Sequence, residues 1–529
     1  MTSHSSPSVW MASIGAAVLS SVVAFGSPAR AETTITAVME SGVRVTDPIL
    51  TTAHITRDFA YMIYDTLLGM NSKFEVEPQM ASVKISDDKL TYTFTLRDGL
   101  KWHDGSDVKP DDCVASLERW MKRDSGGQLI HDDMASLKVT GDKTFALTLK
   151  KPFAPALQIL AKPSSLVPFM MPKKVAETPA DQPIKGFDGS GPFKVVDFKP
   201  GVKVVFEKFK DYKPAPGKAD WFAGGKVADV DKVVWETMPD SQTAINALMS
   251  GEIDFYQTPS YDLLPVLQAN PELTVKVMDK TGSQFIGRMN FLYPPFNNKK
   301  LRQAALAAFD QKDFLDAAVG HPEYFQKCGA TMGCGTPYGF ADGSETLTHG
   351  GDMAKAKKLL KEGGYDGTPI VILQPTDNAS ITTQPLVAAQ LLRKAGFKVK
   401  LEPMDWQSVV IRRASKAKPS EGGWNMFFTG WEIPEINTPL NNPMLNARGD
   451  QAWFGWPKDE KFEGLRKEFM DASDEAGRKA AAEKIQSYAM DDVLFVPLGQ
   501  YTSPWAWSNK LSGIPDTPFP VFWGVSKKD

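Results

Sequence analysis

Helix-like and strand-like patterns alternate through the second half of this chain, and the alternation limits its possible folds more than any other feature. Strands that alternate with helices form sheets joined by right-handed crossovers. The pattern therefore predicts an α/β lobe after about residue 300, and a last helix is expected at 474–490. The alternating segments are helical at 301–309, 353–362 and 383–394 and extended at 370–373, 398–403 and 424–429.

An earlier part of the chain carries a similar pattern. A short strand is indicated at 33–39, and it is followed by an apolar helix pattern that extends to Leu68. Further strands are indicated at 202–206 and 230–237, and a helix at 241–251 ends with a glycine. A strand that leads into a helix is typical of α/β structure, so we expect a first α/β lobe here.

A block of different character interrupts this first lobe. Apolar residues and threonine alternate regularly at 90–96, and 145–149 repeats the pattern. Both segments are typical of half-buried antiparallel strands. Between them a helix is expected to begin at Pro110, with acidic residues in its first turn and an apolar stripe that includes Leu117 and Met121. The block therefore predicts a small α+β subdomain.

The length of the chain also favours several lobes. It has 529 residues, whereas single hydrophobic cores stop growing at roughly 250–300 residues. Apolar residues make up 42% and charged residues 23%, which is typical of a soluble globular protein. The net charge of −3 gives no reason to expect a nucleic acid or an anionic membrane surface as a partner.

The N-terminal residues have the pattern of a secretory signal peptide. An apolar run at 10–25 is too short to span a bilayer comfortably, and the triplet Ala29-Arg30-Ala31 follows it. We predict export to the periplasm with cleavage after Ala31. No Lys or Arg precedes the run, which indicates an atypical signal or a misassigned start, and a short buried helix is the alternative. No cysteine ends the run, so a lipoprotein is not expected.

Three cysteines occur in the chain. Cys328 and Cys334 flank a flexible segment, and an oxidising compartment favours a disulfide between them. A pair of metal thiolates is the alternative, although no cluster of Cys or His supplies the remaining ligands. Cys113 lies in a helical pattern and is expected in the core.

Five short segments carry a recognisable signature. The longest is TYTFTLRDGLKWHDGSDVKPDD at 91–112. The others are IYDTL at 63–67, GSGPF at 189–193, ALMSGEID at 247–254, and NF at 290–291 leading to PFNNKKLRQA at 295–304. In order and spacing these segments resemble the family 5 extracellular solute-binding proteins, of the dipeptide, oligopeptide and nickel-binding type. The resemblance covers essentially the whole mature chain.

This resemblance implies an α/β, two-lobed periplasmic binding protein fold of the large, three-subdomain type, with a ligand cleft between the lobes. The chain would cross between the lobes twice, near 282–291 and 497–501. The expected parts are a signal peptide at 1–31, the first part of lobe I at 32–70, its β-rich subdomain at 71–184, its second part at 185–282, lobe II at 283–500 and the return to lobe I at 501–529.

A search for catalytic motifs favours a binding protein over an enzyme. The chain contains no HExxH, GxxxxGK[ST] or GxGxxG motif, and its six histidines are too scattered to indicate ligand spacing. The sequence at 189–191 fails as a nucleophile elbow because residue 188 is Asp, so Ser190 is expected in a turn before a strand. We predict no catalytic residue, no metal site and no cofactor.

The segment FFTGWEIPEIN at 427–437 offers the main candidates for ligand contact. Trp431 belongs to a Gly-Trp pair that resembles the family's ligand-facing strand end, with core packing as the alternative. In peptide-binding members an acidic residue follows and anchors the ligand's α-amino group, because a buried ammonium needs a counter-charge. Glu432 or Glu435 could serve here, although the family's Gly/Asp/Asn-rich run is missing. An exposed acidic loop is the alternative.

Other candidates lie at the first crossing and at strand ends. Arg288, next to Asn290 in the first crossing, could hold a carboxylate with two hydrogen bonds, and a surface salt bridge is the alternative. Ligands of α/β sheets bind at the carboxyl ends of strands. The residues that follow two such ends are Ser41, Arg44, Tyr256 and Gln257.

These patterns and the resemblance predict the periplasmic substrate-binding component of an ABC transporter. It would capture short peptides, close its lobes around them and deliver them to an inner-membrane ABC permease with its ATPase subunits. A monomer is expected. The alternatives are a receptor for another small solute, such as a nickel chelate, heme, an opine or an amino-acid conjugate, and a periplasmic hydrolase. A chaperone-like interaction module is a further class.

Overall fold

The computed structural model divides into two compact units, Met1–Glu32 and Thr33–Asp529. All helices and strands given below belong to the second unit. The predicted signal run at 10–25 and its cleavage site at Ala31 lie outside the described residues. None of the helices in the described part of the chain is long and apolar enough to cross a membrane. The structure describes residues 1–2, 4–5, 7–8, 32–378 and 380–528.

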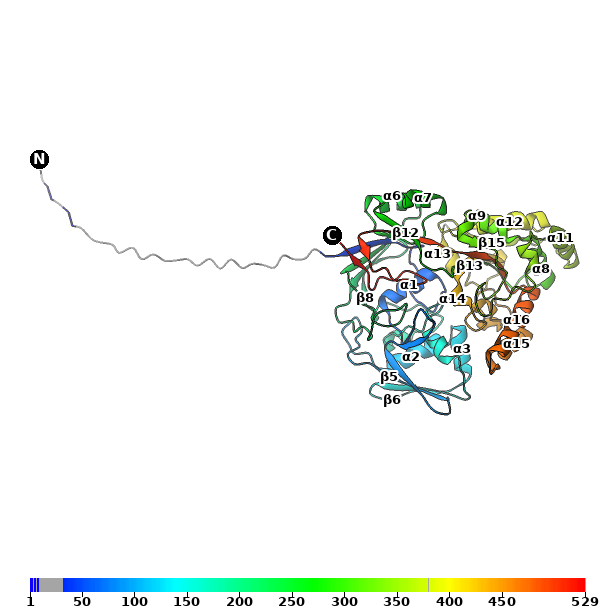
Figure 1. Ribbon diagram of the computed structural model, residues 1–529, viewed down its shortest axis with the longest axis horizontal. Coiled ribbons are helices and arrows are strands. Elements are labelled where there is room, and N and C mark those ends of the chain that lie inside the picture. Colours follow the sequence, from blue (N-terminus) through cyan, green and yellow to red (C-terminus); the bar gives the residue numbers. More distant parts are fainter. Residues whose placement is uncertain (3, 6, 9–31, 379, 529) are drawn as a thin grey trace. The chain divides into compact units, whose positions relative to one another are not determined.

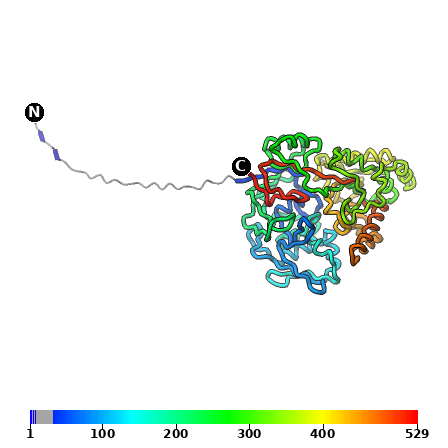
Figure 2. The backbone as a smooth tube through the Cα atoms, in the orientation of Figure 1, coloured from blue at the N-terminus to red at the C-terminus, as the bar shows by residue number. Residues whose placement is uncertain are grey.

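A seven-stranded mixed sheet, here called the first sheet, is built from segments far apart in sequence. β1 lies near its middle and pairs in parallel with β10 and β11, whereas the other pairs are antiparallel. The C-terminal strand β19 lies between β11 and β12, and Figure 2 shows this red segment among blue and green ones. The strand order is β12 (Leu273–Val277), β19 (Pro504–Ser508), β11 (Phe255–Tyr256), β1 (Thr34–Val38), β10 (Lys232–Glu236), β9 (Lys203–Lys208) and β8 (Phe193–Lys199).

A six-stranded sheet, the second sheet, is formed by the later half of the chain. β15 pairs in parallel with β16 and β17, as the alternating pattern predicts, whereas β13 is antiparallel to β17 and β18. The strand order is β14 (Phe325–Gln326), β18 (Val496–Tyr501), β13 (Ser283–Met289), β17 (Met426–Glu432), β15 (Ile370–Pro375) and β16 (Val399–Met404).

The chain passes between the two sheets along two adjacent paths. β12 pairs with β19 in the first sheet, and β13 pairs with β18 in the second. The connections are therefore residues 278–282 and 502–503, which we call the crossing segments. Gly282 has a φ of +70°, and a Cβ atom there would lie 2.3 Å from the carbonyl oxygen of Tyr501. Only glycine fits both the conformation and the space.

A four-stranded antiparallel sheet forms the α+β block that interrupts the first sheet. β5 (Thr91–Leu96) pairs directly with β7 (Thr144–Leu149), which confirms the predicted antiparallel strands. Phe94 and Phe145 stack across this pair with ring centroids 4.9 Å apart. Trp102 and Trp120 belong to the same hydrophobic cluster, which is separate from the main core. The outer strands are β4 (Ala81–Ile85) and β6 (Met134–Gly141), and the helices are α2 (Pro110–Met121), α3 (Ser125–Asp132), α4 (Ala156–Ala161) and α5 (Lys173–Ala176).

Helix α1 (His54–Ile63) packs on the first sheet through Phe59, whose ring contacts Phe198 and Phe206. The sequence pattern predicts a helix that continues to Leu68, and this prediction is wrong. The carbonyl oxygen of Ile63 accepts a hydrogen bond from the backbone N–H of Gly191, so the last turn is not continued. Leu68 instead begins the short strand β2 (Leu68–Met70), which pairs with β3 (Val76–Pro78).

Most of the helices around the second sheet begin at aspartate or asparagine caps. The side chain of Asp405, for example, accepts from the N–H of Ser408 at the start of α13. Figure 1 shows α8, α9, α11 and α12 near β13 and β15. The helices are α8 (Lys299–Ala308), α9 (Gln311–Ala318), α10 (Glu345–Thr348), α11 (Met353–Glu362), α12 (Gln384–Ala395), α13 (Trp406–Arg412), α14 (Ile433–Ile436), α15 (Glu460–Asp471) and α16 (Glu475–Asp492).

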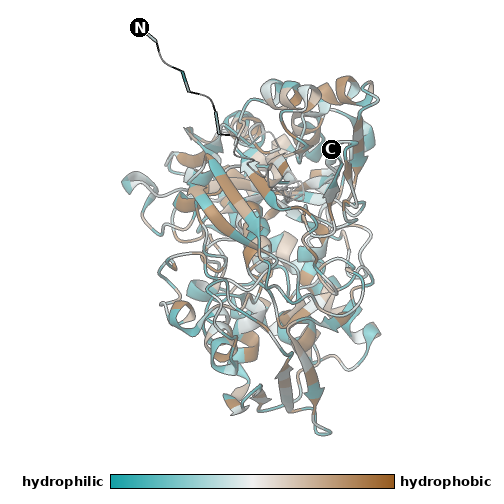
Figure 3. Ribbon diagram, turned by 90° about the vertical axis from the view of Figure 1, so that its left-hand side faces the viewer, coloured by the Kyte–Doolittle hydropathy of each residue, from teal (hydrophilic) through white to brown (hydrophobic). Residues whose placement is uncertain are grey.

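Hydrophobic and hydrophilic positions lie side by side along many elements, as Figure 3 shows. Strand β15 of the second sheet differs, because Ile370 to Leu373 are all buried. A continuous apolar run is typical of a strand covered on both faces. The remaining elements are α6 (Ser241–Ser250), α7 (Leu264–Gln268), β20 (Leu511–Ser512) and β21 (Ser526–Lys527).

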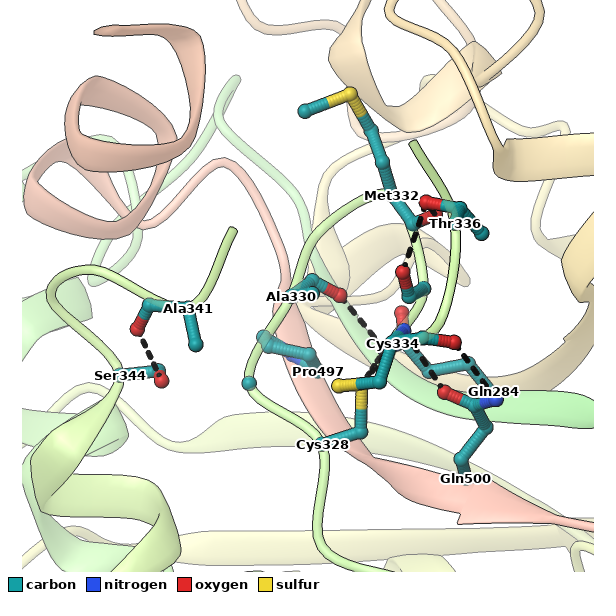
Figure 4. The surroundings of a disulfide bond; sticks show 12 residues. Gln284, Cys328, Ala330, Met332, Cys334, Thr336, Ala341, Ser344, Pro497 and Gln500 are labelled. Atoms are coloured by element: carbon teal, nitrogen blue, oxygen red, sulfur yellow. Dashed lines mark hydrogen bonds between the residues drawn. A yellow bond between two sulfur atoms is a disulfide. The ribbon is translucent and has the colours of Figure 1, made fainter. Parts of the chain in front are cut away.

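A disulfide joins Cys328 and Cys334, as predicted. The loop that it closes is hydrogen-bonded to both strands next to the crossing segments (Figure 4). The Gln284 side chain donates to the carbonyl oxygen of Ala330 at 2.8 Å, and the N–H of Cys334 donates to the Gln500 side chain at 3.0 Å. The loop is therefore attached to β13 and β18 at once.

Candidate functional site

Two neighbouring pockets, of about 40 and 70 Å³, lie between the first and second sheets. We call them together the cleft. Both are lined by Glu40, His54, Ser380 and Tyr501. Glu40 follows β1 of the first sheet, whereas Ser380 follows β15 of the second. The cleft thus has walls from both sheets and lies beside the crossing segments. A larger cavity of about 240 Å³ adjoins it at Thr52.

A buried ion-pair cluster connects the two walls. The guanidinium of Arg57, on α1, donates to both carboxylate oxygens of Glu432, at 2.8 and 2.9 Å. It also donates to Glu435 at 3.2 Å and to Asp58 at 2.9 Å. Its flat face lies 3.4 Å from the ring centroid of Phe519. A guanidinium matches a carboxylate geometrically in this two-bond arrangement, so the contact is specific as well as charged.

His54 occupies the first turn of α1, one helical turn from Arg57. Its Nε2 atom lies 3.0 Å from an oxygen of Glu435, and its Nδ1 atom lies 3.9 Å from Glu432. Burial disfavours the charged imidazolium, but the two carboxylates outweigh burial and raise the pKa of His54 to about 9. His54 is therefore a cation at neutral pH.

The two glutamates differ in their surroundings. Burial and the charge of Glu435 raise the pKa of Glu432 above its ordinary value, against the opposing effect of Arg57. For Glu435, the ion pairs with His54 and Arg57 outweigh burial and lower its pKa. The hydroxyl of Ser164 also donates to Glu435. The carboxylates thus have partners from the protein itself.

Three of the residues expected from sequence line the cleft. Trp431 is 1% exposed, and its ring meets those of His54 and Trp453 edge to face. Its indole N–H is buried without a hydrogen-bond partner among the described residues. Gln257 accepts a hydrogen bond from the backbone N–H of Glu40 at 2.9 Å. Glu432 is the third predicted residue that lines the cleft. These three stay proposals as ligand contacts.

Three other predicted residues lie next to the cleft. Glu435 is behind Glu432 in the ion-pair cluster. Ser41 accepts from the side chain of Gln407 at 3.4 Å, and Arg44 forms a 2.8 Å ion pair with Asp405 at the start of α13. Ser41 and Arg44 therefore contact the second-sheet side from the end of β1.

The remaining predicted residues are used inside the core. Tyr256 is buried, and its hydroxyl lies 3.4 Å from Ser241. Arg288 is fully buried and neither forms a surface salt bridge nor lines the cleft. Asn290 donates to the carbonyl oxygen of Trp424 at 2.9 Å. The guanidinium of Arg288 donates to the backbone carbonyl oxygens of Phe454, Met444, Leu494 and Trp453. These contacts leave the three side chains occupied, and we do not include them in the proposed site.

Sequence reasoning missed several residues of the cleft, namely Glu40, His54, Arg57, Ser380, Trp406, Arg413 and Tyr501. One signal was present for two of them. His54 and Arg57 lie three residues apart at the start of a helix whose second half, 59–63, is apolar, so they share one face. Arg413 gave no such signal, because it belongs to a basic run that is typical of an exposed surface.

Two lobes of mixed α/β structure with a cleft between them, joined by two adjacent crossing segments, define a solute-binding protein. The chain matches the family described as "Bacterial extracellular solute-binding proteins, family 5 Middle" over residues 75–453. The chain belongs to this family, as the five sequence segments predicted.

Comparisons with individual proteins agree. The chain is 38% identical to "Probable peptide ABC transporter periplasmic-binding protein y4tO" of Sinorhizobium fredii, over 94% of each chain. It is 28% identical to the glutathione-binding protein GsiB of Salmonella typhi, over 80% of this chain and 78% of that one. Among solved structures, the periplasmic binding protein DppA of Helicobacter pylori in complex with the peptide STSA has a TM-score of 0.79 at 25% identity, covering 94% of this chain and 99% of that one.

Proposed function

We propose that this protein captures short peptides in the cleft and delivers them to an inner-membrane ABC permease and its ATPase subunits. The observation that carries the proposal is a cleft whose walls come from two sheets, between which the described chain passes at the crossing segments 278–282 and 502–503. Such an arrangement lets two lobes rotate about a hinge and enclose a ligand. A relative at 38% identity is named as a peptide-binding protein of this kind.

Binding, without chemistry on the ligand, is the proposed activity. A ligand favours the closed form only to the extent that it binds that form more tightly. The ion-pair cluster between Arg57 and the two glutamates is a contact that closure forms and opening breaks. We propose that the permease recognises this closed form.

The proposed parts keep the boundaries expected from sequence: lobe I at 32–282 with its β-rich subdomain at 71–184, lobe II at 283–500, and the return at 501–529. The proposed ligand contacts are Gln257 and Trp431, with Glu432 at their edge. We further propose cleavage after Ala31, a monomer free in the periplasm, and no lipid anchor.

Mass spectrometry of small molecules released from the purified protein tests the ligand class. A thermal-shift screen of di- to pentapeptides, nickel chelates and amino-acid conjugates accompanies it, because a ligand of the native state raises the melting temperature. We expect intact short peptides to be released and to stabilise the protein. Stabilisation by a chelate or conjugate but by no peptide would contradict the peptide proposal, and turnover of the ligand would indicate a hydrolase.

A further inference from the structure

Six arginine side chains are buried in the described part of the chain, and one of them lacks the partners that the other five have. Arg57, Arg119, Arg302 and Arg466 pair with carboxylates, and Arg288 donates to four backbone carbonyl oxygens. Arg413 has neither kind of environment. A buried charge without a partner costs several kcal/mol, so this exception calls for a cause.

Arg413 follows α13 and is 1% exposed. Its Nη2 atom makes two long hydrogen bonds, of 3.3 and 3.4 Å, to the hydroxyls of Thr51 and Thr52. Its Nε atom is buried without a partner, and Nη1 makes no hydrogen bond to any described residue. No carboxylate of the described residues lies within ion-pair distance. Burial alone lowers the pKa of Arg413 to about 9.

Aromatic rings hold this guanidinium in place. Its central carbon lies 5.4 Å from the ring centroids of Trp406 and Phe454, 5.7 Å from Phe427 and 5.8 Å from Trp453. Ring faces attract a cation but accept no strong hydrogen bonds, so the donors of the guanidinium stay available. Rings on several sides also fix its direction, which prepares it for a planar anion.

The guanidinium lines the cleft together with neutral polar side chains. Asn378, Ser380 and Thr429 lie in the same pocket, and Thr52 comes from the opposite wall. Among the acidic residues that line the cleft, Glu432 is paired with the protein's own Arg57 and His54, whereas Glu40 lines the pocket of Arg413 without forming an ion pair with it. Arg413 therefore lacks a counter-anion, whereas Glu432 already has its counter-cations.

We infer that Arg413 is the anchor of the ligand, and that it binds a carboxylate of that ligand with two hydrogen bonds in the closed cleft. This inference rests on the proposed binding function and narrows it to carboxylate-bearing solutes. The carboxylate could belong to a peptide C-terminus or to an acidic side chain, and both would meet the same fork of donors.

The test uses four defined pools of compounds, each incubated with the ligand-stripped full mature protein. They are tetrapeptides with neutral side chains and a free C-terminus, the same peptides as C-terminal amides, amides that contain one glutamate, and non-peptide carboxylic acids. Mass spectrometry after gel filtration measures what the protein retains. We expect free acids or glutamate-containing amides to be retained at least about tenfold better than neutral amides.

Two variants and a control locate the effect. Arg413→Met should retain these compounds at least about tenfold less than the wild type does. Arg413→Lys should retain an intermediate amount, because an ammonium lacks the planar fork of donors. Arg412→Met removes the neighbouring guanidinium, which is paired with Glu402 away from the two pockets of the cleft, so it should retain the same compounds as the wild type. Without ligand, Arg413→Met should melt at the wild-type temperature or above, since it removes an unpaired buried charge.

The outcomes separate this inference from the proposed function. Retention of non-peptide acids but no peptide, lost in Arg413→Met, would refute peptide transport and support the anion anchor. Equal retention of acids and amides, or unchanged retention by Arg413→Met, overturns the anchor while leaving peptide binding intact. A ligand-free Arg413→Met that melts well below the wild type also overturns it, because Arg413 would then be structural. Retention of nothing overturns both.

Discussion

Arg57 and Glu432 are joined across the cleft by two hydrogen bonds of 2.8 and 2.9 Å, although they come from α1 on the first sheet and β17 in the second. An acidic residue at this place was expected to meet the ligand. In the structure the carboxylate of Glu432 is paired with the protein's own Arg57, and its contact with a ligand stays a proposal. The ion pair therefore reports on how the two lobes hold together.

Replacing Arg57 with methionine should strongly destabilise the closed form. Glu432 and Glu435 would lose their main counter-charge, and breaking a buried ion pair on one side costs about 3–5 kcal/mol. Urea unfolding measures the loss, and small-angle scattering measures the opening. The double variant Arg57→Met/Glu432→Met should recover much of the stability. Arg119→Met, which breaks a buried pair with Asp47 outside the cleft, should destabilise without opening.

Stability should fall as the pH rises above neutrality. The pKa of His54 is raised from 6.5 to about 9, so its contribution is complete below about pH 6.5 and is lost as pH rises through about 9. The raised pKa of Glu432 acts in the same direction. We expect the free energy of unfolding to fall by about 3 kcal/mol over this range. His54→Gln should flatten the curve, and an equal fall in the wild type and in His54→Gln would contradict this account.

Glu435 should make the stability depend on pH in the opposite direction. Its pKa is lowered from 4.5 to about 2, so its contribution is present above about pH 4.5 and is lost as pH falls through about 2. Unfolding measured between pH 5 and 2 should show a steeper loss in the wild type than in Glu435→Gln. Equal slopes would mean that the ion pair with His54 is not formed in solution.

The disulfide should stabilise the protein by about 2 kcal/mol, because it closes a short loop. The variant Cys328→Ser/Cys334→Ser is expected to unfold at lower urea concentration by that amount. A reducing agent should bring the wild type to the level of the variant and leave the variant unchanged. Cys113→Ser is the control, since that cysteine is free.

Gly282→Ala should impair the crossing between the lobes. The added Cβ atom would lie 2.3 Å from the carbonyl oxygen of Tyr501, at a φ of +70°. We expect a loss of about 1–3 kcal/mol in urea unfolding and a changed closing rate on ligand binding. Gly186 has a φ of +80°, but an added Cβ atom there would have no other atom within 4 Å. Gly186→Ala therefore measures the cost of the backbone conformation alone. Equal losses at both positions would exclude the steric contact as the cause.

Much of the architecture could be predicted from local patterns. The alternating segments after residue 300 indicated the parallel pairs of the second sheet, and 90–96 with 145–149 indicated the antiparallel pair. The helix end at Ile63 could not be predicted, because it depends on Gly191, a residue 128 positions later in the chain. Local propensity does not contain such long-range hydrogen bonds.

The site was harder to predict for the same reason. Trp431 and Glu432 adjoin a motif, and they lie at the cleft. Arg288 lies in an apolar segment and Arg413 in a basic run, yet the first donates to backbone carbonyls in the core and the second faces the cleft with its Nε atom unpartnered. The difference comes from tertiary packing, since the carbonyl oxygens around Arg288 come from residues at least 156 positions away.

The position of β19 in the first sheet governs when this protein can fold. This strand lies between β11 and β12, yet it comes from 504–508, among the last residues of the chain. A chain that emerges from its N-terminus onward therefore cannot complete its first sheet until nearly all of it is available. Early fragments keep an unfilled gap between two strands, which delays stable structure. Late completion of this kind would suit the proposed export, if the chain crosses the membrane before it folds.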